Sequence, residues 1–392
     1  MLRKILVSDL ALGMHIHEFC RPRTNDPFWI GQVEAVLRDI EVLERIKRSD
    51  TLEVWIDTCR GKAPDTCSPV QNADVAPVSL DKELLRARLI CGRAKNAVMS
   101  MFAEAKMGHA LNTDDIELLI EEISGSVMRN PHALISLSRL KNSDEYTYMH
   151  SVAVCALMVA LARRMDLPED QVRDAGVAGL MHDVGKMMMN PDILNKPGQL
   201  TREEFEAMKS HPEAGLKILE GSCQVTRAVM DVCLHHHEKF DGSGYPHGLV
   251  GEEISLFARM GAVCDVYDAI TSDRPYKKAW GAARAIREMA TWKGHFDDKI
   301  FQHFVKTVGI YPVGALVRLE SGRLAVVMEQ SEQSLLTPKV KVIMSARTGK
   351  PLEHRIVHLG KSQEADSIIK FECPHEWGIE KFNELWAGAP LN

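Results

Sequence analysis

Hydrophobic and polar positions divide the chain into segments with different periodicities. Near the start, short alternating segments at 4–7 and 52–57 enclose a helical pattern at 32–47. This combination predicts a small α+β domain over residues 1–61. Residues 62–79 are rich in Pro, Ser, Asp and Asn and lack apolar periodicity, so they predict a linker.

The middle of the chain is dominated by helical spacing. Apolar positions over 80–128 predict connecting helices that brace the domain that follows. Nearly every segment of 144–304 has the same period, and 152–161 is apolar almost throughout. Thr201 and Glu204 form a capping-box pattern that predicts the start of a further helix. The central domain, residues 129–309, is therefore expected to be all-α.

The pattern changes again after the helices. Short alternating runs at 315–319, 324–329 and 340–343 are separated by Gly-containing turns, which predicts antiparallel strands. Residues 310–392 are therefore expected to form a small β appendage. The predicted fold class is mainly α, with a central helical bundle, a small N-terminal α+β domain and this C-terminal antiparallel sheet.

Composition narrows the functional class. The 392 residues are 45% hydrophobic and 26% charged, with a formal net charge of -6, so no basic stripe for a nucleic-acid polymer is expected. We expect no membrane span, because no run approaches eighteen uninterrupted apolar residues. The nine cysteines are scattered and never spaced C-x-x-C, which favours reduced thiols and a cytoplasmic location.

Histidine and aspartate residues concentrate near the predicted helix ends of the central domain. Imidazole and carboxylate groups are the usual ligands of divalent transition metals, although a single histidine has a structural role more often. A bridging carboxylate can hold two cations roughly 3.5–4 Å apart, which suits phosphoryl chemistry. The adjacent pair His182-Asp183 is the natural bridge between the two cations. The set comprises His182, Asp183, His211, His236, His237 and Asp265.

Four sequence motifs give the central domain a specific resemblance. LMHDVGK at 180–186 and HHEKFDGSGYP at 236–246 resemble the two defining motifs of HD-GYP domains. HPEAG at 211–215 and DVYDAITSDRPYK at 265–277 are similar to two further family elements. The resemblance is strong over roughly 130–305, and the N-terminal segments GMHI and VWIDTCRG are similar to a small domain of unassigned role that precedes HD-GYP domains.

The resemblance implies an HD-type helical bundle with two divalent metal ions. By position in the family motifs, one ion is expected on His150, His182 and Asp265, the other on His211, His236 and His237, with Asp183 as the bridge. The family favours iron or manganese, whereas the ligand types alone leave nickel, cobalt and zinc open. His235 is the extra histidine of its triplet, and Asp268 is expected to support a ligand through a hydrogen bond.

The resemblance also implies which groups contact the substrate. Asp183 and Lys186 are the expected catalytic residues. Lys186 follows Asp183 by three residues and is expected to face a metal-bound phosphate, with a solvated helix-end lysine as the alternative. Arg274 and Lys277 match phosphate-contacting cations of the family, with ordinary surface charge as the alternative. Tyr245 is expected to bind substrate, with packing as the alternative. It belongs to a loop that shapes the site and has been linked in the family to contacts with diguanylate cyclases (GGDEF proteins).

The activity that the resemblance implies is hydrolysis of cyclic di-GMP by a metal-activated hydroxide. Tyr146 stands where some family members carry a glutamate for a third metal, so we expect two metals. The linear product pGpG is then expected, with GMP as the alternative end product. Two other functions stay open: a cyclic di-GMP receptor with little turnover, and a phosphohydrolase of another nucleotide. The sequence does not settle whether the chain is a homodimer.

Overall fold

The chain folds into two compact units, residues 1–74 and 75–392. None of the helices described is both long and apolar enough to cross a membrane. The computed structural model describes residues 2–7, 10–19, 35–47, 53–57, 60–62, 77–108, 113–138, 146–221, 225–272, 279–331, 334–361 and 366–388.

The first unit is a small antiparallel sheet with one helix. The strand order is β1-β4-β2-β3. Val54 and Ile56 alternate along β4 and join Leu43 and Ile46 of the helix in one hydrophobic core. The elements are β1 (Leu2–Leu6), β2 (His15–Phe19), β3 (Ala35–Val36), α2 (Ile40–Lys47) and β4 (Glu53–Asp57).

The helix of this unit is shorter than the sequence pattern suggested. The apolar spacing predicted a helix over 32–47, but Ala35 and Val36 pair with β2 and the helix begins at Ile40. Asp39 explains the boundary, because its carboxylate accepts the Glu41 N–H at 2.8 Å. The polar side chain at that position starts the helix, so the preceding residues stay extended.

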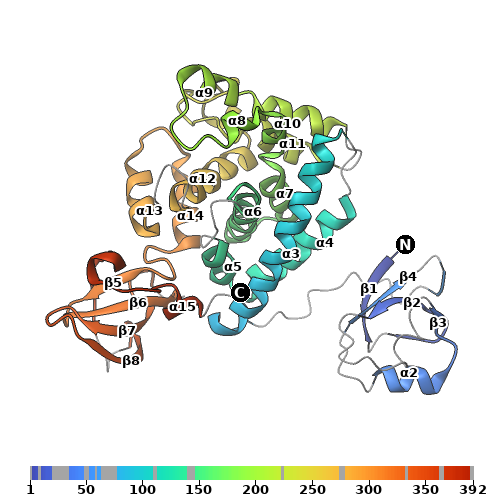
Figure 1. Ribbon diagram of the computed structural model, residues 1–392, viewed down its shortest axis with the longest axis horizontal. Helices are drawn as coiled ribbons and strands as arrows, with labels where there is room; N and C mark the ends of the chain where they lie inside the picture. Colours follow the sequence, from blue (N-terminus) through green and yellow to red (C-terminus); the bar gives the residue numbers. More distant parts are fainter. Residues whose placement is uncertain are drawn as a thin grey trace. The chain divides into compact units, whose positions relative to one another are not determined.

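The second unit contains the predicted all-α domain (Figure 1). The capping box on Thr201 and Glu204 is confirmed, since each side chain accepts the other residue's N–H. The helices are α3 (Leu80–Lys106), α4 (Thr113–Arg129), α5 (Pro131–Ser138), α6 (Tyr146–Arg164), α7 (Glu169–Met181), η3 (Val184–Met188), α8 (Pro191–Leu194), α9 (Arg202–Met208), α10 (His211–Glu220), α11 (Arg227–His235), η4 (Gly251–Glu253), α12 (Leu256–Thr271), α13 (Ala282–Thr291) and α14 (Asp298–Val308).

Helix α6 is the centre of the bundle. Every residue from Val152 to Ala162 is buried, as expected for a helix that is apolar on all sides. It contacts α3, α4, α5, α7, α12 and α14, which surround it in Figure 1. Its N-terminal turn carries His150, so this side chain is fixed by the most deeply buried helix of the domain.

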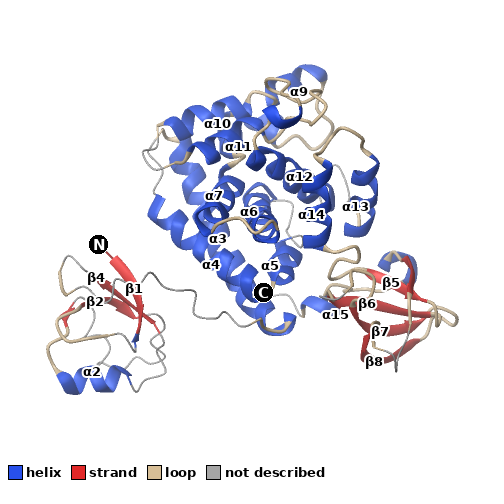
Figure 2. Ribbon diagram, turned by 180° about the vertical axis from the view of Figure 1, so that it is seen from behind, coloured by secondary structure: helices blue, strands red, loops and turns tan. Residues whose placement is uncertain are grey.

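The C-terminal sheet shares its core with the helices. Leu316, Leu324 and Val326 belong to the hydrophobic core of the helical domain. The alternate residues, such as Val317 and Ala325, face a second, smaller core. The strand order is β8-β7-β6-β5-β9. Figure 2 shows the sheet beside the helices. The elements are β5 (Leu316–Leu319), β6 (Arg323–Glu329), β7 (Lys339–Ser345), β8 (Pro351–His358), β9 (Ile368–Phe371), η6 (Pro374–Trp377) and α15 (Glu384–Ala387).

Candidate metal centre

The expected ligands meet at one point inside the helical domain. They come from the first turn of α6, the ends of α7 and α11, the start of α10 and the middle of α12. All are buried except His237, which is partly exposed. The side chains that lie together are His150, His182, Asp183, His211, His236, His237 and Asp265.

The Asp183 carboxylate lies between two groups of imidazoles. Its Oδ2 is 3.3 Å from His182 Nε2 and 3.5 Å from His150 Nε2. Its Oδ1 is 3.3 Å from His211 Nε2 and 3.7 Å from His236 Nε2. Each carboxylate oxygen therefore faces a different pair of ring nitrogens, which is the arrangement that a bridging ligand requires.

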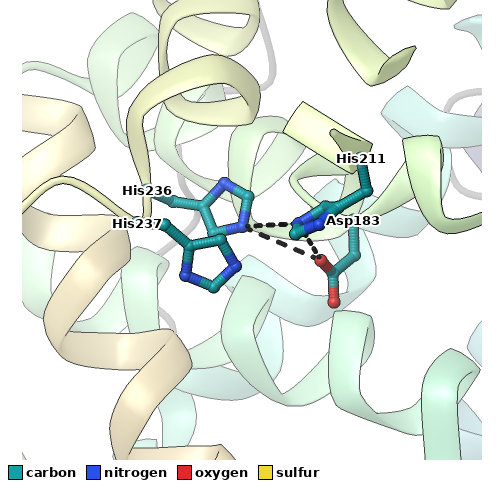
Figure 3. A group of neighbouring side chains, drawn as sticks. All are labelled: Asp183, His211, His236 and His237. Atoms are coloured by element: carbon teal, nitrogen blue, oxygen red, sulfur yellow. Dashed lines mark hydrogen bonds and ion pairs between the residues drawn. The ribbon is translucent and has the colours of Figure 1, made fainter. Parts of the chain in front are cut away.

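The second group is shown in Figure 3, where His211, His236 and His237 surround one side of Asp183. His211 Nε2 and His236 Nε2 are 3.4 Å apart, and the rings of His236 and His237 have centroids 4.1 Å apart. These imidazoles come from α10 and from the end of α11. Three nitrogens and one carboxylate oxygen within this space suit a single transition metal ion.

Asp265 closes the other side of the centre. Its Oδ1 is 3.0 Å from His150 Nε2 and 3.9 Å from His182 Nε2. Its Oδ2 is 3.7 Å from His237 Nδ1, so the same carboxylate also faces the second group. Asp265 therefore contacts both halves of the cluster.

The far nitrogen of most of these rings is held by an acceptor. His182 Nδ1 lies 2.8 Å from the Gly179 carbonyl, and His211 Nδ1 lies 2.7 Å from the Met208 carbonyl. His150 Nδ1 lies 2.6 Å from Asp268 Oδ2. With Nδ1–H donating outward, Nε2 carries the lone pair that faces the centre, as in protein metal sites.

The protonation states also fit a cation. Burial lowers the pKa of His237 to about 3 and holds the pKa of His236 well below its usual range. Burial alone would raise the pKa of Asp183, but the facing His182 and Lys186 charges hold it well below its ordinary value. At neutral pH His236 and His237 offer free imidazole lone pairs and Asp183 an ionised carboxylate. His182 differs, because burial alone would lower its pKa but the facing Asp183 charge raises it.

Two buried polar atoms of this cluster lack a hydrogen bond to the described residues. His182 Nε2 and Asp183 Oδ1 have no hydrogen-bond partner among the described residues. Buried polar atoms without partners are rare and costly. Both atoms face the middle of the cluster, so a metal ion would satisfy them.

Lys186 lies beside the bridging carboxylate, with Nζ 2.5 Å from Asp183 Oδ2. The η3 turn that carries it passes very close to α10. A Cβ on Gly185 would lie 1.9 Å from the His211 carbonyl oxygen, so only glycine permits this approach. The glycine therefore allows the segments carrying Lys186 and His211 to meet at the centre.

Glu238 fixes the loop that follows α11. It is 2% exposed, and its carboxylate accepts the N–H groups of His247, Gly248 and Leu249 at 2.7, 3.0 and 3.2 Å. Within this loop the Tyr245 ring stacks on His237, with centroids 4.7 Å apart. Burial, aided by the charges of Asp265 and Asp183, raises the pKa of Tyr245, so its phenol stays protonated and can donate.

His235 points into a separate network. Its Nδ1 is 2.7 Å from Asp231 Oδ1 and its Nε2 is 3.0 Å from His247 Nδ1. Both ring nitrogens are therefore occupied outside the centre.

Three predicted positions cannot be placed. Arg274 and Lys277 lie outside the described residues, and so does the side chain of Tyr146, although the backbone of Tyr146 begins α6. The structure therefore gives no contact for either cation and no geometry for the third-metal position.

Sequence reasoning missed Glu238, which holds the loop beside the site, and the position of Lys209 next to Tyr245. Glu238 directly follows the two histidines of its motif, and this position is the sequence feature that could have indicated its role. Lys209 Nζ lies 5.6 Å from the Tyr245 ring centroid. Nothing in its local sequence pattern separates it from a surface lysine.

Two family models match the chain. The model of the HD domain covers residues 128–300. A model described as a domain of unknown function (DUF3391) covers residues 2–116.

Several curated proteins are similar to the chain. Cyclic di-GMP phosphodiesterase PA4108 of Pseudomonas aeruginosa is 53% identical, over 99% of this chain and 96% of that protein. The response regulator RpfG of Xanthomonas campestris, also named a cyclic di-GMP phosphodiesterase, is 40% identical over 42% of this chain and 44% of that protein. A 3'3'-cGAMP-specific phosphodiesterase of Vibrio cholerae is 35% identical over 49% of this chain and 37% of that protein.

Among solved structures, Bd1817, described as an HDG"Y"P protein from Bdellovibrio bacteriovorus, matches with a TM-score of 0.48 and 19% sequence identity. The match covers 78% of this chain and 99% of that one.

Proposed function

The chain belongs to the HD-GYP family, and from that premise we propose that it is a phosphodiesterase that hydrolyses cyclic di-GMP. The observation that carries the proposal is the position of Asp183, whose two oxygens face two different groups of imidazoles. The full-length relative named a cyclic di-GMP phosphodiesterase supports this substrate. It also favours hydrolysis over a receptor with little turnover.

We assign two divalent metal ions to the centre, most consistent with iron or manganese. His150, His182 and Asp265 would hold one, and His211, His236 and His237 the other, with Asp183 shared. When bound, such ions supply an activated water and neutralise phosphate charge. The outward hydrogen bonds of the rings and the two orphaned polar atoms support this set.

The surrounding residues would orient the substrate. Lys186 is placed to contact the phosphate at the centre, because its ammonium already lies beside the Asp183 carboxylate. Tyr245 offers a protonated phenol at the edge of the centre. Arg274 and Lys277 complete the proposed phosphate contacts by analogy with the family motif alone. The proposed main product is the linear dinucleotide pGpG.

The proposed setting is the cytoplasm. No disulfide joins the described cysteines, which agrees with a reducing compartment. The loop bearing Tyr245 has exposed positions, including Asp241 and Ser243, that are accessible to a diguanylate cyclase. That contact and a homodimer are further parts of the proposal.

A turnover assay tests the function. The full chain is loaded anaerobically with iron or manganese and incubated with cyclic di-GMP, 3'3'-cGAMP and cyclic di-AMP, and the products are separated by chromatography. We expect pGpG from cyclic di-GMP at the highest kcat/KM. Binding of cyclic di-GMP without turnover would instead make the chain a receptor, and preference for 3'3'-cGAMP would change the substrate.

A further inference from the structure

We propose that Lys209 binds the second phosphodiester of the cyclic dinucleotide, the one that is not being cleaved. This inference rests on the proposed function. A cyclic dinucleotide carries two phosphodiester groups in one ring, each with a negative charge. The metal centre and Lys186 account for one of them. Arg274 and Lys277, assigned to phosphate contacts by the family motif, lie outside the described residues. Among the described residues, a cation at the border of the site is available to the second phosphodiester.

Lys209 occupies such a position. It ends α9 and precedes the proposed ligand His211 by two residues. Its Nζ lies 5.6 Å from the centroid of the Tyr245 ring, and that ring stacks on His237. The ammonium therefore lies next to the aromatic residue that borders the centre, without contacting the proposed ligands directly in any described interaction.

The present partner of the Lys209 ammonium is one that a substrate phosphate can replace. Its Nζ is 2.8 Å from Glu206 Oε1 and 5.1 Å from the centroid of the Phe205 ring. The side chain of Lys209 is 30% exposed and that of Glu206 is 59% exposed. An ion pair this open to water is weak and screened, so a phosphate oxygen can replace the Glu206 carboxylate. The two aromatic rings keep the ammonium in place meanwhile.

Lys186 differs from Lys209 in its partner. Its ammonium contacts the buried Asp183 carboxylate and is 21% exposed, so it is aimed at the group bound over the metals. Lys209 pairs only with an exposed carboxylate in the interactions described. A lysine ammonium is a compact point charge with three donors, which suits the oxygens of a phosphodiester better than the flat face of a base.

Two substitutions separate substrate binding from a structural role. Lys209→Met keeps an unbranched side chain on the two rings and removes the charge, and we expect the KM for cyclic di-GMP to rise about tenfold. Glu206→Gln removes the competing carboxylate, and we expect KM to fall. A purely structural ion pair predicts the same direction for both variants, because each breaks the same contact.

Bis(4-nitrophenyl) phosphate provides a second readout, since it carries a single phosphodiester. We expect Lys209→Met to hydrolyse it at the wild-type rate, with unchanged metal content. Lys217→Met, on the exposed side of α10, is the matched control and should leave both substrates unaffected.

The proposal is overturned if Lys209→Met and Glu206→Gln shift KM in the same direction, or if Lys209→Met impairs both substrates equally. An unchanged KM in Lys209→Met also overturns it. These results leave the proposed function intact, because wild-type protein would still hydrolyse cyclic di-GMP. Wild-type protein that hydrolyses only bis(4-nitrophenyl) phosphate would defeat the proposed function itself.

Discussion

At the scale of single residues, a hydrogen bond on the outer nitrogen of four of the imidazoles decides which nitrogen faces the centre. Backbone carbonyls at helix ends serve His182, His211 and His236. His150 differs because its acceptor is a buried carboxylate, Asp268, at 2.6 Å. A carboxylate acceptor also increases the basicity of the ring. Because this acceptor is a side chain and not a backbone carbonyl, a substitution of Asp268 can remove it.

Replacement of Asp268 tests that dependence. Asp268→Ala leaves His150 free to rotate and to change tautomer, and we expect metal affinity to fall roughly 10- to 100-fold. The measurement is metal content after dialysis against a graded series of chelator concentrations. Asp170→Ala, an exposed position in the first turn of α7, serves as the control. If Asp268→Ala and Asp170→Ala retain equal amounts of metal, Asp268 does not support His150 as a ligand.

Residue types and spacing identified the cluster but not its connections. The adjacent His182-Asp183 pair and the His236-His237 pair predicted a shared centre, and the structure brings these side chains together. The partner of His235 was not predictable, because Asp231 reaches it one helical turn away while His247 approaches through a loop. Loop conformation brings such residues together, and spacing does not encode it.

At the scale of elements, two ion pairs of different burial join α3 and α4, which both contact the central helix α6. Glu83 of α3 is fully buried, and its carboxylate accepts two hydrogen bonds from Arg129 of α4, at 2.8 and 2.9 Å. Arg93 and Glu122 join the same two helices at 2.9 Å but remain exposed. The two pairs therefore allow a comparison that differs mainly in burial.

Removal of one charge from each pair should have unequal effects. Glu83→Gln leaves the Arg129 guanidinium without a counter-charge, and we expect the free energy of unfolding to fall by about 3 kcal/mol. Glu122→Gln is expected to cost less than about 1 kcal/mol. Urea denaturation followed by circular dichroism measures both. Similar losses in the two variants would contradict a role for burial.

Prediction of elements from sequence succeeded where the pattern was long or strongly capped. The buried α6 and the capped α9 followed from apolar spacing and from Thr201 and Glu204. The helix predicted over 32–47 was wrong in its first part, because pairing of Ala35 and Val36 with β2 outweighs the local helical pattern. Strand pairing is a contact between distant residues, so a local window cannot reveal it.

At the scale of the whole molecule, the N-terminal unit and the C-terminal sheet of the second unit differ in how they depend on the rest of the chain. Residues 1–74 have a hydrophobic core of their own, whereas the C-terminal segment contributes Leu316 and Val326 of the sheet and Trp386 of α15 to the core of the helices. The predicted boundary at residue 309 therefore lies inside a continuous core. The alternation of the strands indicated a sheet, but not which surface would cover its second face.

Truncation tests this difference. Removal of residues 1–74 is expected to leave a folded protein with the metal content of the full chain, because the remaining unit keeps its core. Removal of residues 310–392 is expected to expose apolar surface and to abolish cooperative thermal unfolding. The measurement is calorimetry combined with metal analysis. A cooperative transition in the second variant at the temperature of the full chain would contradict a shared core.

The central claim is that the Asp183 carboxylate is shared by two metal ions that drive hydrolysis of cyclic di-GMP. The most direct measurement is metal content and turnover of Asp183→Asn beside the wild type, after identical anaerobic loading. The amide keeps the size of the side chain but removes the charge and one acceptor oxygen. We predict a folded protein with reduced metal content and no measurable pGpG formation. Wild-type metal content together with wild-type turnover would contradict the account.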